Sequence, residues 1–336
     1  MCQSANDNQQ PQYDERQPAL SRREFIVGSA VAAGGLALGT NPTMAADRTT
    51  NRHGLSQVRV IQGRSKHVLT PLAIHEDVLR DLLEMVVTRL SGKERVADAW
   101  HEFLKPDDII ALKFNRNGAR TIATTAPLLR AFVASLGSAG FKPSQIVAVE
   151  VSNELRSSTQ TLAPVQGWSK EVYDFGSGKD QLAAWLDQVT AIINVPFLKT
   201  HNLAVMTGAM KNISHAVVKH PARYHENGCS PFIGDIVALP QVRNKLRLHI
   251  VNALRIVFDE GPVPREETIW DGGFLIGGTD PVAVDVSGLH LIDRVRKAVG
   301  LPLIGETSLP AYLEAADGAG VGTGAVHKIS LEKVKL

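Results

Sequence analysis

Apolar residues recur along this chain with two different periods, and the periods predict its secondary structure. Near-continuous apolar runs cover residues 108–114, 145–151 and 189–195, which is typical of strands buried on both faces. Residues 76–90 instead carry apolar side chains at steps of three and four, which predicts an amphipathic helix. These side chains are Val78, Leu79, Leu82, Leu83, Val86 and Val87. A second helix is predicted at residues 127–136, between the first two strands.

The alternation of strands and helices continues to the end of the chain. Further strands are predicted at residues 58–61, 248–251, 255–258, 273–277 and 326–334, and further helices at 181–186, 205–217 and 281–299. Apolar strands that alternate with helices indicate an α/β layered fold with a mostly parallel central sheet flanked by helices. Residues 152–177 and 220–231 are irregular and polar, and we interpret both stretches as loops that form a site.

The first 46 residues have the features of an export signal. Arg22 and Arg23 stand directly before a weakly apolar run at residues 25–38, an arrangement that twin-arginine export systems recognise. The run is too short to span a bilayer as a helix, which takes about 20 apolar residues. Small residues follow, so we expect cleavage after Ala45 or Ala46. The expected partner is therefore the twin-arginine translocase, and the expected location is the periplasm or the cell exterior.

These features divide the chain into three segments. We predict a signal peptide at residues 1–46, a flexible neck at 47–56 and a single α/β domain at 57–336. With 44% hydrophobic residues, the chain has ample material for one large core. No apolar stretch after the signal peptide is long and unbroken enough to span a membrane.

Composition excludes several classes of function. A net charge of +2 is too balanced to indicate nucleic-acid binding, and 5% aromatic residues provide few surfaces on which bases stack. Cys229 is the only cysteine after the signal peptide, which excludes an internal disulfide and any all-cysteine iron–sulfur or zinc site. Its turn-like context, Asn-Gly-Cys-Ser-Pro, favours an incidental thiol over a nucleophile.

Functional side chains follow the predicted strands. In open α/β sheets, ligands bind beyond the carboxyl ends of the strands. Lys113 and Asn115 stand at one such end, and Lys199 and His201 follow another, closely after a proline that interrupts regular pairing. The spacing of two places each pair on one side of an extended chain. Asp259 stands at a third strand end, before a turn.

The predicted helix at residues 205–217 adds a polar stripe beside these strand ends. Thr207, Lys211 and His215 recur every four residues, opposite an apolar face. The apolar face is made of Met206, Ala209, Met210, Ile213, Ala216 and Val217. Periodicity alone is compatible with a solvated stripe. The helix starts only a few residues after His201, however, so we expect the stripe to adjoin the strand end.

The basic residues at these positions predict a cationic pocket. Lys113, Lys199, Lys211 and Arg223 would together suit a carboxylate or a phosphate. Packed lysines lower one another's pKa, which suits one of them to act as a base or a nucleophile.

Metal binding is a competing use of the same region. The candidate ligands are His201, His215, His220 and His225, with Asp259, Asp280 and Asp285 as sources of oxygen. Their spacing matches no standard ligand motif, and neighbouring lysines would repel a cation. We therefore assign no metal ligand, and the cofactor remains unknown.

The stretch from residue 193 to residue 225 resembles a known family. The motifs are NVPFLKTH at residues 194–201, TGAMKN at 207–212, RYH at 223–225, KFN at 113–115, the strand before Glu150, Asp259 with Gly261 and Pro262, and GGTDPVAVD at 277–285. With these motifs the chain, from about residue 107 to residue 299, resembles the domain of unknown function 362 family. The resemblance implies a family position without an activity, because no activity is established for the family in general. Many relatives carry cysteine-rich ferredoxin-like segments, which this chain lacks, so no electron-transfer role is inferred.

The preferred hypothesis is an exported enzyme that acts on a small anionic substrate in this pocket. Lys199 or Lys211 would bind the anion or act as a base, and His201 would transfer protons near neutral pH. The substrate-binding residues would be Lys113, Asn115, Asn212, Arg223, His225, Asp259 and Asp285. Either Asp259 or Asp285 would fix the catalytic lysine or histidine. Two alternatives stay open: a periplasmic protein that binds an anion without turnover, and a His/Asp metalloprotein.

Overall fold

The computed structural model describes residues 48–50, 56–70, 73–306 and 308–336. The predicted signal peptide lies outside these residues, as do positions 47 and 51–55 of the predicted neck. Arg48–Thr50, also within the predicted neck, pairs with the following strand. The described residues belong to one compact unit, Ala45–Leu336. None of the helices in the described ranges is both long enough and apolar enough to cross a bilayer.

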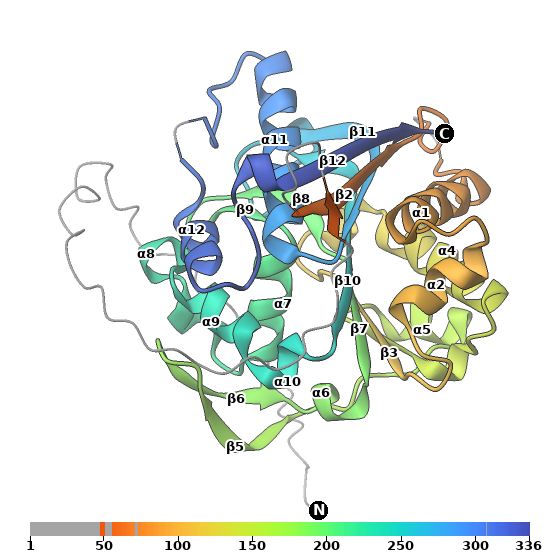
Figure 1. The fold of residues 1–336 in the computed structure, drawn as a ribbon, viewed down its shortest axis with the longest axis horizontal. Helices are drawn as coiled ribbons and strands as arrows, with labels where there is room; N and C mark the ends of the chain where they lie inside the picture. Colours follow the sequence, from red (N-terminus) through yellow and green to blue (C-terminus); the bar gives the residue numbers. More distant parts are fainter. Residues whose placement is uncertain (1–47, 51–55, 71–72, 307) are drawn as a thin grey trace, which may run out of the picture. The chain divides into compact units, whose positions relative to one another are not determined.

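The strands of the described residues form a central ten-stranded sheet in this unit (Figure 1). Its strands are β1 (Arg48–Thr50), β2 (Ser56–Arg64), β3 (Ile110–Lys113), β4 (Ile146–Val149), β7 (Ala191–Asn194), β8 (Phe197–His201), β9 (Val205–Thr207), β10 (Leu246–Val257), β11 (Ile269–Gly278) and β12 (Ile329–Lys335). The main path runs β1-β2-β11-β10-β7-β3-β4, and β4, β3, β7 and β10 are parallel neighbours. β11 is antiparallel to both β10 and β2, and β12 lies parallel to β2. A separate hairpin consists of β5 (Trp168–Asp174) and β6 (Lys179–Ala183).

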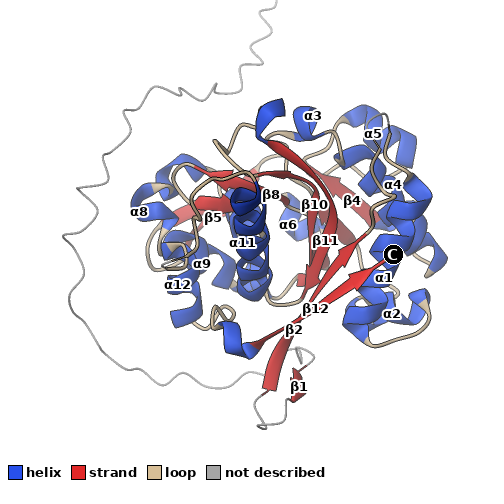
Figure 2. Ribbon diagram, turned by 90° about the horizontal axis from the view of Figure 1, so that it is seen from above, coloured by secondary structure: helices blue, strands red, loops and turns tan. Residues whose placement is uncertain are grey.

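Helices cover both faces of the sheet. One layer contains α1 (Glu76–Ser91), α2 (Val96–Phe103), α4 (Thr125–Ser138) and α5 (Asn153–Thr159); the other contains α7 (Ala209–Val217), α9 (Phe232–Ala238), α11 (Pro281–Ala298) and α12 (Ala311–Gly318). Figures 1 and 2 show the two layers on opposite sides of the strands. The short helices are α3 (Ala119–Ile122), α6 (Trp185–Gln188), α8 (Glu226–Cys229) and α10 (Pro240–Arg243), with 3-10 turns at Pro143–Gln145, Pro221–Tyr224, Glu266–Thr268 and Val326–Lys328. The predicted fold class, a mostly parallel α/β sheet flanked by helices, is confirmed.

Two hydrophobic cores result from the alternation of side chains along the strands. On β3, Ile110 and Leu112 belong to the core under α1 and α4, whereas Ala111 belongs to the core under α7 and α11. β7 repeats the pattern, with Ile192 on the α7 side and Ile193 on the α4 side. Because successive side chains point to opposite faces, every strand buried on both faces needs a near-continuous apolar run.

Most predicted elements are present, and the differences have local causes. The segment 181–186 was predicted to be helical, but it contains the end of β6 and the start of α6, because Lys179–Ala183 pairs with β5. The predicted helix at 205–217 begins only at Ala209, because Val205–Thr207 pairs with β8 as β9. The predicted strands at 248–251 and 255–258 belong to one strand, β10, which ends at Val257 and has an irregularity between Ala253 and Arg255.

A broken strand positions the functional residues. β7 and β8 are separated by Val195 and Pro196, and both pair with β10 in parallel. Pro196 has no N–H, but its carbonyl oxygen accepts a hydrogen bond from Asn252 N at 2.7 Å. Beyond this break the chain continues into the β8–β9 hairpin and then α7. The hairpin and α7 therefore stand beside the carboxyl ends of β3 and β7.

Candidate functional site

A polar row crosses three parallel strands on the face covered by α7. Asn194 is in register with Lys113 on β3 and with His249 on β10, and all three side chains are buried. Asn194 Nδ2 lies 3.1 Å from His249 Nδ1 and donates to Ala209 O at 2.8 Å. Asn212 on α7 completes the network through a hydrogen bond from its Nδ2 to Asn194 Oδ1 at 2.7 Å. Side-chain hydrogen bonds thus join the amino-terminal part of α7 to the strand ends.

Lys113 is the lysine of this network, and it is almost completely enclosed. Its side chain is 2% exposed, and its Nζ donates to Asn212 Oδ1 at 2.7 Å and to Asn212 O at 2.8 Å. Glu150 Oε2 lies 3.3 Å from the same nitrogen and also accepts from Arg116 N at 2.8 Å. Burial lowers the pKa of Lys113, while the charge of Glu150 opposes this effect. Glu150 is not among the predicted site residues, although it stands directly after β4, at the carboxyl end of a strand like the other candidates.

Lys199 is also buried, without a carboxylate partner in the described part of the chain. Its Nζ donates to Pro262 O at 2.9 Å and Asn117 O at 3.1 Å. Burial, together with the charges of Lys211 and Lys113, lowers its pKa to about 7, although Glu150 opposes this shift. An ordinary lysine has a pKa of about 10.4.

Glycine at position 261 allows the chain to place the Pro262 carbonyl beside Lys199. A Cβ at Gly261 would lie 1.8 Å from Thr200 O, far inside van der Waals contact. Only glycine lets the turn that carries Pro262 close against β8, where Gly261 N donates to Thr200 Oγ1 at 3.0 Å. The turn supplies one of the two carbonyl acceptors of Lys199.

Lys211 and His225 form the second half of the site. Lys211 Nζ lies 3.0 Å from His225 Nε2 and 3.9 Å from Cys229 Sγ. Burial lowers the pKa of Lys211 to about 8, although the Cys229 thiol opposes the shift. Burial and the charge of Lys211 lower the pKa of His225 to about 4. His225 is therefore neutral at pH 7, and its Nε2 accepts the hydrogen bond from Lys211.

His201 is held as a neutral imidazole. Its Nδ1 accepts hydrogen bonds from Leu203 N at 3.1 Å and Ala204 N at 3.2 Å, so its proton is on Nε2. Burial, followed by the charge of Lys211, lowers its pKa to about 2. The ring is stacked on His225, with centroids 5.8 Å apart. Such a group donates a hydrogen bond, and it does not take up a proton near neutral pH as the sequence had suggested.

His215 and Cys229 adjoin this pair. The His215 ring contacts the His225 ring edge-on, with centroids 4.6 Å apart. Cys229 is fully buried, and burial raises its pKa while Lys211 lowers it. We call the group Lys113, Lys199, His201, Lys211, His215 and His225 the Lys/His cluster. The sequence around Cys229 indicates an incidental thiol, and only its contact with Lys211 of the cluster indicates otherwise.

The other predicted site residues have different surroundings. Asn115 is buried just beyond β3, whereas Arg223 is exposed and its charge acts on the Tyr224 hydroxyl. Asp259 Oδ1 accepts from Arg296 Nη1 at 2.8 Å. Asp285 accepts backbone hydrogen bonds from the first turn of α7, including that of Met210 N at 3.0 Å. The prediction that Asp259 or Asp285 fixes a catalytic lysine or histidine is therefore wrong, because the hydrogen bonds of both carboxylates go elsewhere.

Backbone strain is concentrated near the cluster. Among the residues that the structure describes, five non-glycine residues there have a left-handed backbone: Glu150, Val205, Asn227, Cys229 and Glu260. For Val205 the φ of 66° is unusual, because its side chain is β-branched. Each such residue costs about 1–3 kcal/mol and persists only where its surroundings impose it. Glu150 and Cys229 contact the lysines of the cluster directly.

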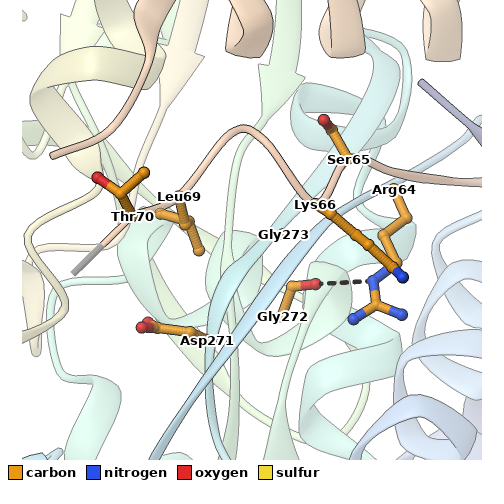
Figure 3. Close-up of a pocket in the computed structure, with 8 residues that line it drawn as sticks. All are labelled: Arg64, Ser65, Lys66, Leu69, Thr70, Asp271, Gly272 and Gly273. Carbon is orange, nitrogen blue, oxygen red and sulfur yellow. Dashed lines mark hydrogen bonds between the residues drawn. The ribbon is translucent and has the colours of Figure 1, made fainter.

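A separate hollow of about 200 Å³ lies where β2 ends and β11 begins (Figure 3). Two of its charged residues have partners: Arg64 Nε donates to Gly272 O at 3.2 Å, and Asp271 accepts from Arg255 at 3.0 Å. The third, Lys66, is exposed. The Arg64 guanidinium also stacks over the Phe274 ring at 4.7 Å. This hollow shares no residue with the Lys/His cluster, and the contacts of Arg64 in it join β2 to β11.

Comparison with known proteins supports the resemblance inferred from the sequence. Residues 176–290 match a family model described as Domain of unknown function (DUF362). The match includes Lys199, His201, Lys211 and His225, whereas Lys113 and Glu150 precede it. A search of the curated proteins found no match.

Proposed function

We propose that this protein is an exported enzyme that acts on a small anionic substrate at the Lys/His cluster. One observation carries the proposal: Lys113, Lys199 and Lys211 are buried together, and Glu150 is the only carboxylate in the described residues that bonds one of them. Burying like charges without partners is costly. A carboxylate or a phosphate would supply the missing negative charge.

The lysines have different roles in this proposal. Lys199, whose pKa is about 7, is partly neutral at physiological pH and acts as the base or nucleophile. Lys211, whose pKa is about 8, remains mostly charged and binds the anion. An anion at this position would raise both pKa values, which couples substrate binding to proton uptake.

The remaining residues bind and orient the substrate. His201 Nε2–H donates a hydrogen bond to it, and Lys113 with Asn212 holds α7 at a fixed distance from the strand ends. Asn115 lies beside Lys113 at the rim, and exposed Arg223 attracts anions to the segment that covers the cluster. A protein that binds the anion without turnover would use the same contacts, and only product formation distinguishes the two functions.

The test is a thermal-shift screen of the mature protein against small carboxylates and inorganic phosphate, followed by product analysis for each ligand that stabilises it. We expect stabilisation that is lost in Lys199→Met and in Lys211→Met. The matched control is Lys170→Met, which changes an exposed lysine on β5. Equal stabilisation in all four proteins would refute the anion site. Stabilisation without product would support binding alone.

Export by the twin-arginine pathway is a second part of the proposal. It is supported by Arg22 and Arg23 before a short apolar run. In a host with this pathway, the full chain should appear outside the cytoplasm with a new amino terminus after Ala45 or Ala46. Replacing both arginines with lysine should retain it in the cytoplasm as an uncleaved chain. Unchanged export of the double variant would contradict the assignment.

A further inference from the structure

Three potential metal ligands converge on one side of the Lys/His cluster. His215 on α7, His225 after the turn at Pro221–Tyr224, and Cys229 at the end of α8 each offer one ligand atom, and these atoms lie within 4.8 Å of one another. Two imidazole nitrogens and a thiolate are the donors preferred by zinc and similar transition metals, rather than by magnesium or calcium.

In His215, Nδ1 carries the proton, and the lone pair on Nε2 accepts no hydrogen bond within the described part of the chain. Ser214 Oγ donates to Lys211 O at 3.3 Å, so the same oxygen accepts from His215 Nδ1 at 3.0 Å. The His215 proton is therefore on Nδ1. Nε2 is buried and makes no hydrogen bond among the described residues, although the backbone of Tyr224 interacts with the ring and opposes the lowering of the His215 pKa by burial. Buried polar atoms without partners are rare in proteins, and a metal-binding histidine has this arrangement, with its other nitrogen held by a hydrogen bond.

His225 and Cys229 both contact the Lys211 ammonium group. Lys211 Nζ lies 3.0 Å from His225 Nε2 and 3.9 Å from Cys229 Sγ. Because an ammonium group donates only, this His225 nitrogen also presents a lone pair. The backbone of Cys229 is held in a left-handed conformation, with φ at 66°, and the side chain is fully buried. The segment that carries the thiol is thus held against α7 at a cost in backbone energy.

We propose that His215, His225 and Cys229 bind one divalent transition metal ion such as Zn²⁺, and that the ion and the Lys211 ammonium compete for this position. The ion takes the position of the ammonium, so the Lys211 side chain moves away from His225 and Cys229 when the ion binds. Cys229 loses its proton on binding and contributes a negative charge that offsets the ion. Three protein ligands leave the fourth tetrahedral position open, as in catalytic zinc sites.

Cobalt is the probe, because a thiolate bound to Co²⁺ gives a charge-transfer absorption band. The mature protein, freed of metal by chelation and then dialysed, should bind one Co²⁺ per chain and show this band. Cys229→Ser should abolish the band, and His215→Ala should abolish stoichiometric binding. His220→Ala is the matched control, because His220 lies close to His225 along the chain but bonds Asp180. This variant should bind Co²⁺ as the parent protein does.

Competition between Lys211 and the metal ion predicts tighter metal binding when Lys211 is removed. A general loss of structure would weaken metal binding instead. Lys211→Met removes the competing cation, so it should bind Co²⁺ about tenfold more tightly while keeping the thiolate band. Absence of the band in the parent protein, its persistence in Cys229→Ser, or unchanged affinity in Lys211→Met would each overturn the proposal. Cys229→Ala provides a second test if the serine variant does not fold.

The result is separable from the proposed function. Anion stabilisation measured with a chelator present should survive in Cys229→Ser and be lost in Lys211→Met. Loss of cobalt binding with an intact anion response would overturn the metal site alone. An absent anion response in a protein that binds cobalt would overturn the anion site alone.

Discussion

Replacing Lys199 with methionine should change how the stability of the protein depends on pH. In the folded state, burial lowers the pKa of this lysine from 10.5 to about 7. In the unfolded chain, the lysine returns to its ordinary pKa. Below pH 7 both states carry the proton, and the folded state bears the full cost of a buried charge. Between pH 7 and pH 10.5 the folded lysine is neutral while the unfolded lysine is still charged.

The magnitude follows from proton linkage. In that window the unfolded state binds more protons, so the free energy of unfolding of the parent protein rises with pH. The slope due to Lys199 is at most about 1.4 kcal/mol per pH unit, which amounts to about 5 kcal/mol over the whole window. Methionine has no such titration. The variant loses the hydrogen bonds to Asn117 O and Pro262 O, but this loss does not depend on pH and cancels when pH values are compared.

The assay is urea unfolding of the parent, Lys199→Met and Lys170→Met proteins at several pH values from 6 to 10. The stability of Lys199→Met relative to the parent should be highest at pH 6 and should fall steadily above pH 7. Lys170→Met should show a difference from the parent that is constant with pH, because Lys170 is exposed. A constant difference for Lys199→Met as well would refute the argument that Lys199 is buried with a lowered pKa.

The other predictions concern the charges that act on Lys199 and two glycines with opposite surroundings. Lys211→Met removes a charge that lowers the pKa of Lys199, so the pH window of the first experiment should move to higher pH; Glu150→Gln removes an opposing charge and should move it to lower pH. Urea unfolding of each variant with and without Lys199→Met measures both shifts, and equal shifts in one direction would contradict the electrostatic model. Gly261→Ala should destabilise the protein by about 2 kcal/mol or more, because its Cβ would lie 1.8 Å from a backbone oxygen of β8. Gly137→Ala, on α4 with open space around it, should stabilise by about 0.5–1 kcal/mol; comparison of the two melting temperatures tests the contrast, and similar effects would contradict it.

Local periodicity accounts for the elements that the sequence predicted correctly. Glu76–Ser91 and Pro281–Ala298 form helices almost at the predicted bounds, because apolar spacing and end signals coincide there. Asp280, for example, accepts hydrogen bonds from Val282 N and Ala283 N and starts the second of these helices. The predictions failed where a partner strand decides the conformation. Val205–Thr207 has apolar spacing compatible with a helix, but it pairs with β8.

The rule that ligands bind beyond the carboxyl ends of strands was informative about the candidate site. It selected Lys113, Lys199 and His201, and the structure places them near one another with Lys211. The rule did not indicate which acid would accompany them. Asp259 and Asp285 were expected near the lysines, but Glu150 has that position because its left-handed backbone, with φ at 60°, turns the chain after β4.

The amino-acid order alone determined the succession of strands and helices and the residue types that follow each strand, because both depend on the geometry of adjacent residues. Burial of the lysines, burial of His215 Nε2 and the approach of Cys229 were decided by tertiary structure. These features depend on how the segment from His220 to Pro231 folds over α7 and how the turn at Gly261 closes on β8. A pKa responds to every charge and every water molecule within a few ångströms, and most of the groups that perturb Lys199 are distant from it along the chain.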